Sequence, residues 1–592
     1  MSEQSDRRSP DFSPDSSTAE PPVKGLTIGQ LLRRSAAEFA GCDALVFPRL
    51  AADGSPYSGE GTPDPSADCY RLTWSQFDAE TDRIARGLLA AGITRGDHVA
   101  VWATNWPRWV LLQFATARVG AVMVTINPAY RSSELAYVLR QSDAKALFLI
   151  DRFRTSDYFQ LLRDAVPQLA TVEPGADTLP ALPECPRLQR IISLNEHSGP
   201  GICSWSAFAA GADAVSPEQL EAASRELTPA DPINIQYTSG TTGFPKGAML
   251  THRNLLYNAY YIGDCMELSS QDRICVPVPF YHCFGCVLGT LCASVYGAAL
   301  IIPHEHFDAE ATLNAIEAER ATAVYGVPTM FIGQLEHPTF GSRDLSSLRT
   351  GIMAGSPCPI EIMKRVVQEM HCSEITIAYG LTEASPVITQ TRTDDPLSLR
   401  VETVGRPIPG IEVKLIDPET GQTLPDSQQG ELCVRGHVVM RGYYNDAAGT
   451  AAAIDSEGWL HSGDLAVRQP DGYYRITGRI KDMICRGGEN IYPREIEEFL
   501  FTHPAIEDVA VFGVPSVKFV EDVACWVRLR EGASLDEEGL RAYCRDRMAH
   551  YKVPRYIRFV TSFPQTVTGK IQKFRMRETM VQELGLKAAE TA

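Results

Sequence analysis

The sequence predicts an α/β protein. It has a large N-terminal domain of parallel-sheet α/β subdomains plus a β-rich subdomain, followed by a small α+β C-terminal domain. Short β-rich runs at 99–102, 121–126 and 145–150 alternate with helical stretches, which is the pattern of a parallel sheet. After residue 410 the chain changes to short strands separated by glycine turns, and beyond residue 481 helices and strands follow in a new order. These three observations predict the fold class.

Length and composition also indicate several domains. The 592 residues exceed the roughly 250–300 that one hydrophobic core organises. A formal net charge of −18 argues against non-specific binding to nucleic acid. Fifteen cysteines without the dense spacing of a disulfide scaffold predict a reducing, cytoplasmic location. The expected division is a disordered tail at 1–25, an N-terminal domain at 26–478, a hinge at 479–482 and a C-terminal domain at 483–592.

Local signals place several elements. The tail is rich in Ser, Pro and acidic residues, a composition that fits neither a packed core nor a secretory signal. Thr73 and Gln76 predict a capping box at the start of a helix, and Pro493 predicts the first turn of another. Ser534 and Glu537 predict a third helix start. The remaining expectations are an exposed loop at 51–68, an irregular stretch at 173–186, β-rich subdomain strands at 412–416, 430–435 and 473–476, and C-terminal strands at 509–514 and 523–529.

The stretch 274–303 carries no formal charge and is long enough to raise the question of a membrane span. Prolines and glycines interrupt it at positions 277, 279, 285, 289 and 297, so we expect a loop, a helix and a strand in a buried core, and no transmembrane span. The stretch includes Cys283 and Cys286 in a C-x-x-C pattern. Without a second pair at zinc-ribbon spacing, they are interpreted as buried structural thiols.

The segment 237–247 concentrates three glycines, four Ser or Thr hydroxyl side chains and one lysine in eleven positions. Glycine lets consecutive backbone N–H groups approach anionic oxygens, so the segment predicts a loop that binds the phosphates of a nucleotide. It is not a Walker loop, because Pro245 stands where the second glycine would be required. Its candidate phosphate-binding residues are Thr238, Ser239, Gly240, Thr241, Thr242, Gly243 and Lys246.

This loop resembles the signature loop of the adenylate-forming superfamily, which includes acyl-CoA synthetases, luciferases and the adenylation domains of peptide synthetases. Further segments resemble the family's motifs, in the family's order, and the resemblance covers the chain from about Leu26 to Leu586. The segments are Pro279-Phe280-Tyr281-His282, Gly355-Ser356-Pro357, Ala378-Tyr379-Gly380-Leu381-Thr382-Glu383, Ser462-Gly463-Asp464, Thr477 to Asp482, Arg486 to Asn490, and Pro564 to Lys570.

The resemblance assigns the nucleotide contacts. Tyr379 packs on the purine, Thr382 contacts the α-phosphate, and Asp464 with Arg479 holds the ribose. Glu383 and the hydroxyl of Thr238 would provide oxygens for Mg²⁺, a hard cation that proteins hold through one or two such groups together with phosphates. The remaining residues implied at the adenylate are Gly355 and Ser356 on the adenine side, and Ala378 and Gly380 in the tyrosine motif.

The resemblance also assigns the chemistry. His282 would lie beside the reacting carboxylate, although a lone histidine in an apolar segment is more often a core residue. Lys570 would bridge the carboxylate and the α-phosphate, and with His282, Thr238 and Glu383 it completes the implied catalytic set. The small C-terminal domain is implied to be mobile, turning about a hinge at Lys481 and Asp482. That motion exchanges Lys570 for a coenzyme A-binding face formed by Gly487, Gly488 and Glu489.

The sequence therefore predicts an ATP-dependent fatty acid:CoA ligase similar to the medium-chain type of acyl-CoA synthetase, with ATP, Mg²⁺ and coenzyme A as cofactor and co-substrates. An aryl or short-chain acid fits the same scaffold, and a peptide-synthetase adenylation domain, a luciferase-like oxygenase and a non-catalytic nucleotide or acyl-CoA sensor are the alternatives. The expected partners are the fatty acid, ATP and CoA, without nucleic acid. Peripheral membrane contact and a homo-oligomer are both left open.

Overall fold

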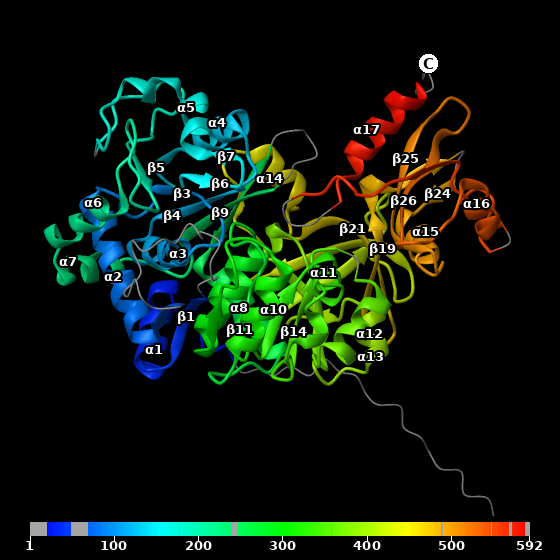
Figure 1. Cartoon of the computed structure of the whole chain (residues 1–592), viewed down its shortest axis with the longest axis horizontal. Helices are drawn as coiled ribbons and strands as arrows, with labels where there is room; N and C mark the ends of the chain where they lie inside the picture. Colours follow the sequence, from blue (N-terminus) through cyan, green and yellow to red (C-terminus); the bar gives the residue numbers. More distant parts are fainter. Residues whose placement is uncertain are drawn as a thin grey trace, which may run out of the picture.

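The chain folds into two large helix-covered sheets, a small β-sheet and a C-terminal α+β unit (Figure 1). The computed structural model describes residues 20–48, 69–176, 178–238, 245–356, 358–486, 489–545, 547–566 and 571–586. The architecture confirms the predicted fold class. In Figure 1 the blue-to-cyan and green regions form the bulk of the molecule, and the orange C-terminal unit lies beyond the yellow strands.

The first sheet has the strand order β20-β10-β9-β4-β3-β5-β8. Parallel pairing of β3 with β4 and with β5 confirms the predicted βαβαβ pattern. Its strands are β3 (His98–Trp102), β4 (Val122–Ile126), β5 (Ala144–Leu149), β8 (Arg190–Ser193), β9 (Pro232–Thr238), β10 (Lys246–Thr251) and β20 (Gly442–Tyr443). The helices of this region are α1 (Ile28–Glu38), α2 (Trp74–Ala90), α3 (Pro107–Val119), α4 (Ser132–Gln141), α5 (Tyr158–Ala165), α6 (Trp205–Ala210) and α7 (Pro217–Arg225), with a small hairpin of β6 (Arg152–Phe153) and β7 (Ser156–Asp157).

The second sheet has the order β17-β16-β15-β14-β13-β11-β12-β1-β2, and its central pairs from β1 to β15 are parallel. Its strands are β1 (Asp43–Pro48), β2 (Cys69–Thr73), β11 (Arg273–Cys275), β12 (Ala299–Ile301), β13 (Ala323–Gly326), β14 (Thr350–Ala354), β15 (Glu374–Gly380), β16 (Val387–Gln390) and β17 (Arg406–Pro407). The helices of this region are α8 (His252–Cys265), α9 (Cys292–Tyr296), α10 (Ala309–Ala318), α11 (Pro328–Leu335), α12 (Ile360–Glu369) and α13 (Leu397–Glu402).

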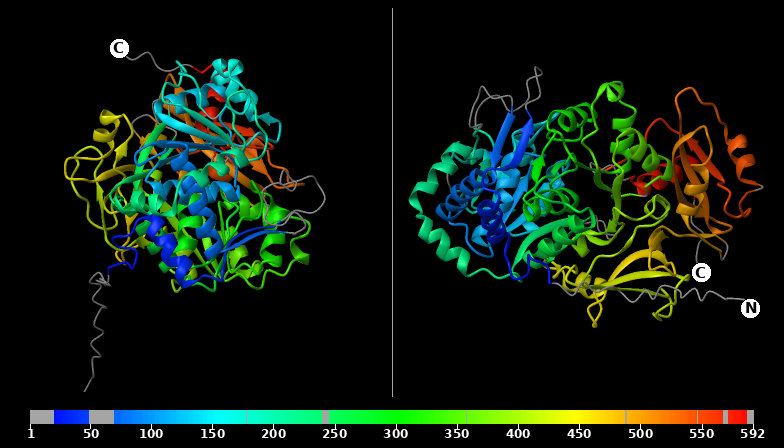
Figure 2. Two further views of the ribbon diagram at one scale, coloured as in Figure 1. Left: turned by 90° about the vertical axis from the view of Figure 1, so that its left-hand side faces the viewer. Right: turned by 90° about the horizontal axis from the view of Figure 1, so that it is seen from below.

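The predicted β-rich subdomain is a four-stranded antiparallel sheet, β18 (Ile411–Ile416), β19 (Gln429–Gly436), β21 (Leu460–Arg468) and β22 (Tyr474–Arg479), with helix α14 (Ala447–Ala453) between β20 and β21. Seen from below in Figure 2, this yellow sheet lies beneath the green region and next to the orange C-terminal unit. Helix α15 of that unit contacts strand β22, so the two are direct neighbours.

The C-terminal unit has its own sheet and its own hydrophobic clusters, made of residues 484–586. Its elements are β23 (Ile484–Arg486), β24 (Glu489–Ile491), α15 (Pro493–Leu500), β25 (Ile506–Ser516), β26 (Val520–Leu529), α16 (Glu537–Arg545), β27 (Tyr556–Phe559) and α17 (Lys573–Leu584). The short 3₁₀ helix Ile480–Asp482 joins this unit to β22. That position matches the expected hinge, but its motion stays a prediction.

The local signals were correct at two helix starts and wrong at a third. Thr73 and Gln76 form both hydrogen bonds of the capping box of α2, and Pro493 is the first residue of α15. At α16, however, the carboxylate of Asp536 rather than Ser534 accepts the hydrogen bond from the backbone N–H of Gly539, at 2.8 Å. Because Asp caps helices as well as Ser does, the nearer carboxylate takes the position.

The uncharged stretch 274–303 lies in the interior of the protein, as predicted. A π-helix (Phe284–Leu291), α9 and β12 succeed one another there, and every residue of the π-helix is buried. Within the described ranges, no helix combines the length and the apolar character that crossing a bilayer requires. The expected tail is shorter at its C-terminal end than predicted, because Val23 is 1% exposed and packs in the main core. Residues 1–19 and the expected loop at 51–68 lie outside the described residues.

Candidate active site

The glycine-rich loop joins two paired strands. Thr238 ends β9, Lys246 begins β10, and these two residues are direct partners in the antiparallel ladder. The pairing therefore brings the two ends of the loop together at the carboxyl end of β9, where open α/β sheets usually bind ligands. Five of the predicted phosphate-binding residues lie outside the described residues, namely Ser239, Gly240, Thr241, Thr242 and Gly243.

The carboxyl ends of several strands of the second sheet point to the same place. Gly355 and Ser356 follow β14, and the Ala378-Tyr379-Gly380 segment ends β15. Gly355 has φ +86°, and a Cβ atom built there would lie 3.1 Å from Val327, which follows β13. Only glycine adopts this backbone conformation readily, so the turn after β14 can approach the neighbouring strand end closely.

Glu383 meets the glycine-rich loop. It lies in the 3₁₀ helix Thr382–Ala384, is 9% exposed, and its Oε1 accepts a hydrogen bond from the Thr238 hydroxyl at 3.2 Å. Two residues 145 positions apart thus come into direct contact, Thr238 at the end of β9 in the first sheet and Glu383 in the short helix that follows β15 of the second sheet. The contact brings together the two oxygen donors that the sequence predicts as Mg²⁺ ligands.

These donors fit a magnesium ion. The Thr238 hydroxyl and the Glu383 carboxylate are hard oxygen groups, and their 3.2 Å separation is close to the roughly 2.9 Å between neighbouring ligands of an octahedral ion with 2.0–2.1 Å bonds. A single carboxylate and a hydroxyl would leave most coordination positions to water and phosphate, which is how Mg²⁺ is usually held with nucleotides.

Sequence analysis missed a second hydrogen-bond donor to Glu383. The Tyr443 hydroxyl donates to the same Oε1 at 2.8 Å. Burial raises the pKa of Tyr443 far above its usual value, and the Glu383 carboxylate raises it further, so the phenol stays a donor at neutral pH. The only available signal was an aromatic pair between two glycine turns, which does not show that Tyr443 reaches Glu383.

Lys246 contacts the same tyrosine. Its ammonium group lies 5.1 Å from the centre of the Tyr443 ring and 3.5 Å from the Asp446 carboxylate. Asp446 also caps α14 by accepting a hydrogen bond from the Gly449 N–H at 2.7 Å. Lys246 therefore supplies positive charge at the end of the glycine-rich loop, as a site for an anion in a strongly acidic protein requires.

Asp464 is held by two partners that the sequence also singled out. Asp464 is 3% exposed, and its carboxylate accepts hydrogen bonds from the Tyr379 hydroxyl at 2.7 Å and from Arg479 Nε at 2.8 Å. Asp464 and Arg479 are cross-strand partners on β21 and β22. Burial alone would lower the pKa of Arg479, but Asp464 and Asp482 raise it, so the guanidinium remains charged.

His282 lies at the start of the buried stretch, in a turn closed by the hydrogen bond from its N–H to the Pro279 carbonyl. Its Nδ1 accepts from the Phe284 N–H at 3.2 Å, so in the neutral ring the proton is on Nε2. The next residue, Cys283, is close to Glu383. Burial raises the pKa of the Cys283 thiol, and Cys286 and the Glu383 carboxylate raise it further.

Several residues of the C-terminal domain that are predicted to bind a ligand or to act in catalysis lie outside the described residues. Gly487, Gly488 and Lys570 lie outside the described residues, as does the side chain of Glu489. Lys481 and Asp482 are in the short helix after β22. The assigned roles of all these residues toward a ligand stay predictions.

The sequence patterns of one enzyme family match most of this chain. The AMP-binding enzyme family matches residues 33–444, and the AMP-binding enzyme C-terminal domain matches residues 495–570. The chain belongs to the AMP-binding enzyme family. This confirms the resemblance to adenylate-forming enzymes that the motifs indicate.

Relatives of this AMP-binding enzyme cover nearly its whole length. The putative acyl-CoA synthetase YngI of Bacillus subtilis (strain 168) is 48% identical over 564 residues, 95% of this chain and 99% of the relative. The mitochondrial medium-chain acyl-CoA ligase ACSF2 of Homo sapiens is 40% identical over 568 residues, 95% of this chain and 89% of that protein.

Solved structures agree on the fold. ATP-bound MatB from Rhodopseudomonas palustris has a TM-score of 0.77 at 26% identity and covers 94% of this chain and 99% of its own. The anthranilate CoA ligase AuaEII in complex with anthranoyl-AMP has a TM-score of 0.79 at 25% identity, with 95% and 98% coverage. A fatty acyl CoA synthetase of Mycobacterium tuberculosis has a TM-score of 0.66 at 26% identity, with 94% and 99% coverage.

Proposed function

We propose that this AMP-binding enzyme is an ATP-dependent fatty acid:CoA ligase that prefers medium-chain acids. The proposal rests on the hydrogen bond from the Thr238 hydroxyl to Glu383, which links the end of the glycine-rich loop to the second sheet. We call this contact the Glu383 joint. The buried Asp464, held by Tyr379 and Arg479, supplies a carboxylate suited to two hydroxyl groups of a ribose. Relatives named as acyl-CoA synthetases and ligases support the reaction class.

In the first half-reaction a carboxylate oxygen of the acid bonds to the α-phosphorus of ATP. The bond from that phosphorus to the bridging oxygen breaks, giving an acyl-adenylate and pyrophosphate. Negative charge is redistributed over the phosphates, so the protein contributes mainly by positioning groups and stabilising charge. The donors proposed for this task are Lys246, Thr238 and Lys570. When bound at Glu383 and Thr238, Mg²⁺ would supply further positive charge to the phosphates.

In the second half-reaction the thiol of coenzyme A attacks the adenylate carbonyl, a carbon–sulfur bond forms, and AMP leaves as the carbon–oxygen bond breaks. The thiol proton must go to a base or to water. We propose that the unit after Asp482 turns about the 3₁₀ helix Ile480–Asp482, so that Lys570 and the Gly487-Gly488 segment serve the two half-reactions in turn. Support comes from the separate core of this unit and the single short connection to β22.

The acyl preference rests on the apolar interior beside His282. The stretch after it is buried and uncharged, and Val327 closes on the turn after β14. An apolar interior of this kind favours an alkyl chain over a charged substituent. The name of the human relative supports a medium-chain acid. That relative is named as mitochondrial, while the cytoplasmic location of this chain stays a prediction from its cysteine content.

An aryl acid is the second candidate, favoured by one comparison. The anthranilate CoA ligase AuaEII has a TM-score of 0.79 with this chain and covers 95% of it. A benzoate-type ring would occupy the same apolar interior but would extend less far into it than the alkyl chain of a medium-chain acid. The two candidates therefore differ in the size of the acid and share the adenylation chemistry.

The deciding experiment measures AMP formed from ATP, Mg²⁺ and coenzyme A with straight-chain acids from acetate to palmitate, and with benzoate and anthranilate. We expect the highest kcat/KM with an acid of about eight to twelve carbons. Each methylene of its alkyl chain that is buried in an apolar site contributes ~0.8 kcal/mol to the free energy of binding. The Glu383→Gln variant is the inactive control. A maximum at benzoate would favour the aryl candidate, and no AMP with any acid would contradict the ligase proposal.

A further inference from the structure

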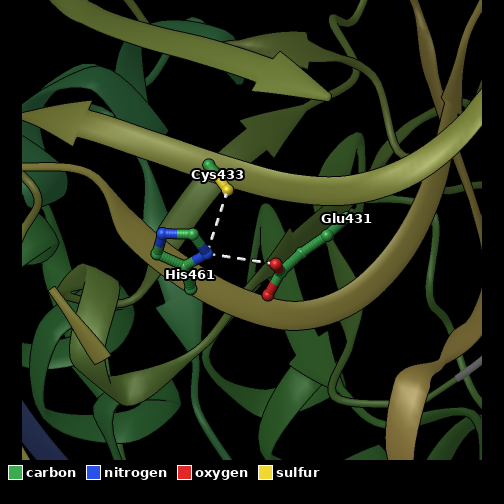
Figure 3. A group of neighbouring side chains, drawn as sticks. All are labelled: Glu431, Cys433 and His461. Atoms are coloured by element: carbon green, nitrogen blue, oxygen red, sulfur yellow. Dashed lines mark hydrogen bonds and ion pairs between the residues drawn. The ribbon is translucent and has the colours of Figure 1, made fainter. Parts of the chain in front are cut away.

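Three side chains with metal-binding atoms converge in the small β-sheet, away from the Glu383 joint. Glu431 and Cys433 lie on one face of β19, two residues apart, and His461 on β21 is the cross-strand partner of Cys433. Their carboxylate, thiol and imidazole atoms all lie within 4.8 Å of one another. Figure 3 shows Cys433 and Glu431 approaching the same nitrogen of His461.

The two distances from His461 Nδ1 are near those between ligands of a tetrahedral ion, the one to sulfur more closely than the one to oxygen. His461 Nδ1 lies 3.6 Å from Cys433 Sγ and 3.0 Å from Glu431 Oε2. Around Zn²⁺ with its usual bond lengths, nitrogen–sulfur and nitrogen–oxygen ligand pairs are about 3.5 Å and about 3.4 Å apart. Small side-chain rotations would therefore be enough to place an ion between the three groups.

The hydrogen bonds of a neutral imidazole do not serve the Cys433 thiol and the Glu431 carboxylate together. A neutral imidazole nitrogen either carries a proton or accepts one. If Nδ1 carries it, the ring donates to Glu431, and the Cys433 thiol then has no acceptor in that nitrogen. If Nδ1 accepts from the thiol, the two acceptors Nδ1 and Glu431 Oε2 face each other at 3.0 Å without a proton between them. A cation at the centre would satisfy all three groups at once.

The far side of the imidazole has the partner that zinc-bound histidines usually have. Nε2 lies 3.6 Å from Asp455 Oδ2, so a carboxylate faces the nitrogen opposite the proposed ion. Asp455 is itself fixed, because its Oδ1 accepts from the backbone N–H groups of Glu457 and Trp459, each at 2.9 Å. This partner would orient the ring and keep the proton on Nε2.

Access and charge also suit a cation. Cys433 is fully buried, whereas the side chains of His461 and Asp455 are about a third exposed, at 30% and 32%. Water can therefore reach the His461 side and provide a fourth ligand. Lys414, opposite Cys433 on β18, is a repulsive neighbour, but its ammonium lies over the Trp459 ring, and two carboxylates and a thiolate would outweigh it.

Cys433, His461 and Asp455 do not make a nucleophilic site. A Cys-His-Asp series has the order of a nucleophile, a base and an orienting group. However, burial raises the pKa of the Cys433 thiol to about 12, with Glu431 raising it further, and the sulfur is shielded from substrates.

We propose that Glu431, Cys433 and His461 form a site for Zn²⁺, with water as the fourth ligand and Asp455 orienting the histidine. Binding releases the thiol proton to solvent. The site is coupled to the region of Asp464, because the other oxygen of Glu431 accepts a hydrogen bond from the Gly463 N–H at 3.0 Å. An ion held here would fix β19 against β21 and stabilise the turn that carries Asp464.

The test uses Co²⁺ as a spectroscopic substitute for zinc on the full chain after dialysis against a chelator. We expect one equivalent to bind, with a thiolate-to-cobalt band in the near ultraviolet and visible bands of tetrahedral intensity. Zn²⁺ should displace it and Mg²⁺ should not. A parent protein that binds no Co²⁺, or binds it without the thiolate band, would overturn the proposal.

Variants assign the ligands. Cys433→Ser should abolish the thiolate band, and His461→Gln should weaken Co²⁺ binding at least 10-fold. Asp455→Asn should weaken it roughly 10-fold, as loss of an outer partner usually does. The exposed Cys42→Ser is the matched thiol control and should keep the full spectrum. If Cys433→Ser fails to fold, His461→Gln decides, because its side chain is partly exposed. An unchanged spectrum in His461→Gln would exclude this site.

Discussion

At the scale of the residue, the hydroxyl of Tyr443 is the part of the Glu383 joint that motif comparison missed. Its 2.8 Å hydrogen bond orients the carboxylate that also meets Thr238. A bond to a charged group contributes about 1.5–3 kcal/mol. We expect Tyr443→Phe to lower the rate of acid-dependent pyrophosphate release roughly 10- to 100-fold and to raise the Mg²⁺ concentration needed for half-maximal rate.

The neighbouring tyrosine is a matched control. The Tyr444 hydroxyl also donates to a carboxylate at 2.9 Å, but the acceptor is Asp143, outside the joint. Tyr444→Phe should therefore leave pyrophosphate release within about 2-fold of the parent, since surface substitutions away from special features have small effects. Equal losses in the two variants would contradict the role given to Tyr443.

Val520 has a backbone conformation that does not suit its side chain. It is 63% exposed, at the start of β26, with φ +71°. A left-handed backbone costs a non-glycine residue about 1–2 kcal/mol, whereas glycine adds about 0.5–1 kcal/mol of unfolded-state entropy. We expect Val520→Gly to stabilise the β25–β26 hairpin by up to about 1 kcal/mol.

Hydrogen exchange of the β25 and β26 amides would measure this locally, because one melting temperature is not well defined for a chain of several domains. Val517→Gly is the control at the same hairpin tip. Val517 is 73% exposed and does not have a positive φ, so glycine there should be destabilising. Slower exchange in both variants would contradict the strain argument.

At the scale of the element, His252 joins the starts of two helices. It is the first residue of α8, it is fully buried, and its Nδ1 accepts from the backbone N–H of Ile28, the first residue of α1, at 3.1 Å. Burial lowers the pKa of His252 to about 4, and nearby Asp231 opposes that shift only partly. The folded state therefore holds this histidine neutral.

The sign of the pH dependence follows. Unfolded His252 takes up a proton below about pH 6.5, whereas the folded state resists protonation down to about pH 4. The free energy of unfolding therefore decreases as the pH is lowered from about 6.5 to about 4, by up to ~1.4 kcal/mol per pH unit. Protection factors of the α1 and α8 amides, measured by hydrogen exchange between pH 7.5 and 5, should fall less in His252→Asn than in the parent. The exposed His197→Asn is the control. His437 contributes in the same direction, so the loss should be reduced and not abolished.

The elements show what sequence reasoning could and could not find. Strands β3, β4 and β5 and the α2 cap were predictable because hydrophobic pattern and capping are local. Strand β21 was missed because Ser462-Gly463 inside it suggests a turn, and Gly463 has φ +69° while the strand continues past it. The cap of α16 was misassigned because Asp536 and Ser534 both satisfy local rules, and only the folded geometry decides between them.

At the scale of the whole molecule, the predictable part of the candidate site is its list of motifs, and the unpredictable part is how they meet. Tyr379, Asp464 and Arg479 were each singled out, but their mutual hydrogen bonds depend on the sheet pairing of β21 with β22 and on packing against β15. Tyr443 and Asp446 carry no motif, and they reach the site because β20 adds to the edge of the first sheet beside β10. Such contacts arise from tertiary structure, which single-sequence patterns do not encode.

The proposal that different residues of the C-terminal unit serve the two half-reactions concerns the whole molecule. A substitution of Lys570 tests it. We expect Lys570→Ala to lower acyl-adenylate formation from acid and ATP by 100-fold or more, since the lysine charge would be lost at the transferring phosphate. Conversion of a supplied acyl-adenylate to acyl-CoA should stay within about 3-fold, because the lysine has turned away by then.

Lys573, three residues further on, provides the control for charge and position. Its ammonium pairs with Glu497 at 2.6 Å inside the C-terminal unit, so Lys573→Ala should affect the stability of that unit and slow both half-reactions to the same small extent. If Lys570→Ala also slowed both steps equally, Lys570 would belong to the structure of the unit and not to adenylation. The proposal that the C-terminal unit turns about the Ile480–Asp482 connection between the two half-reactions would then lose its main support.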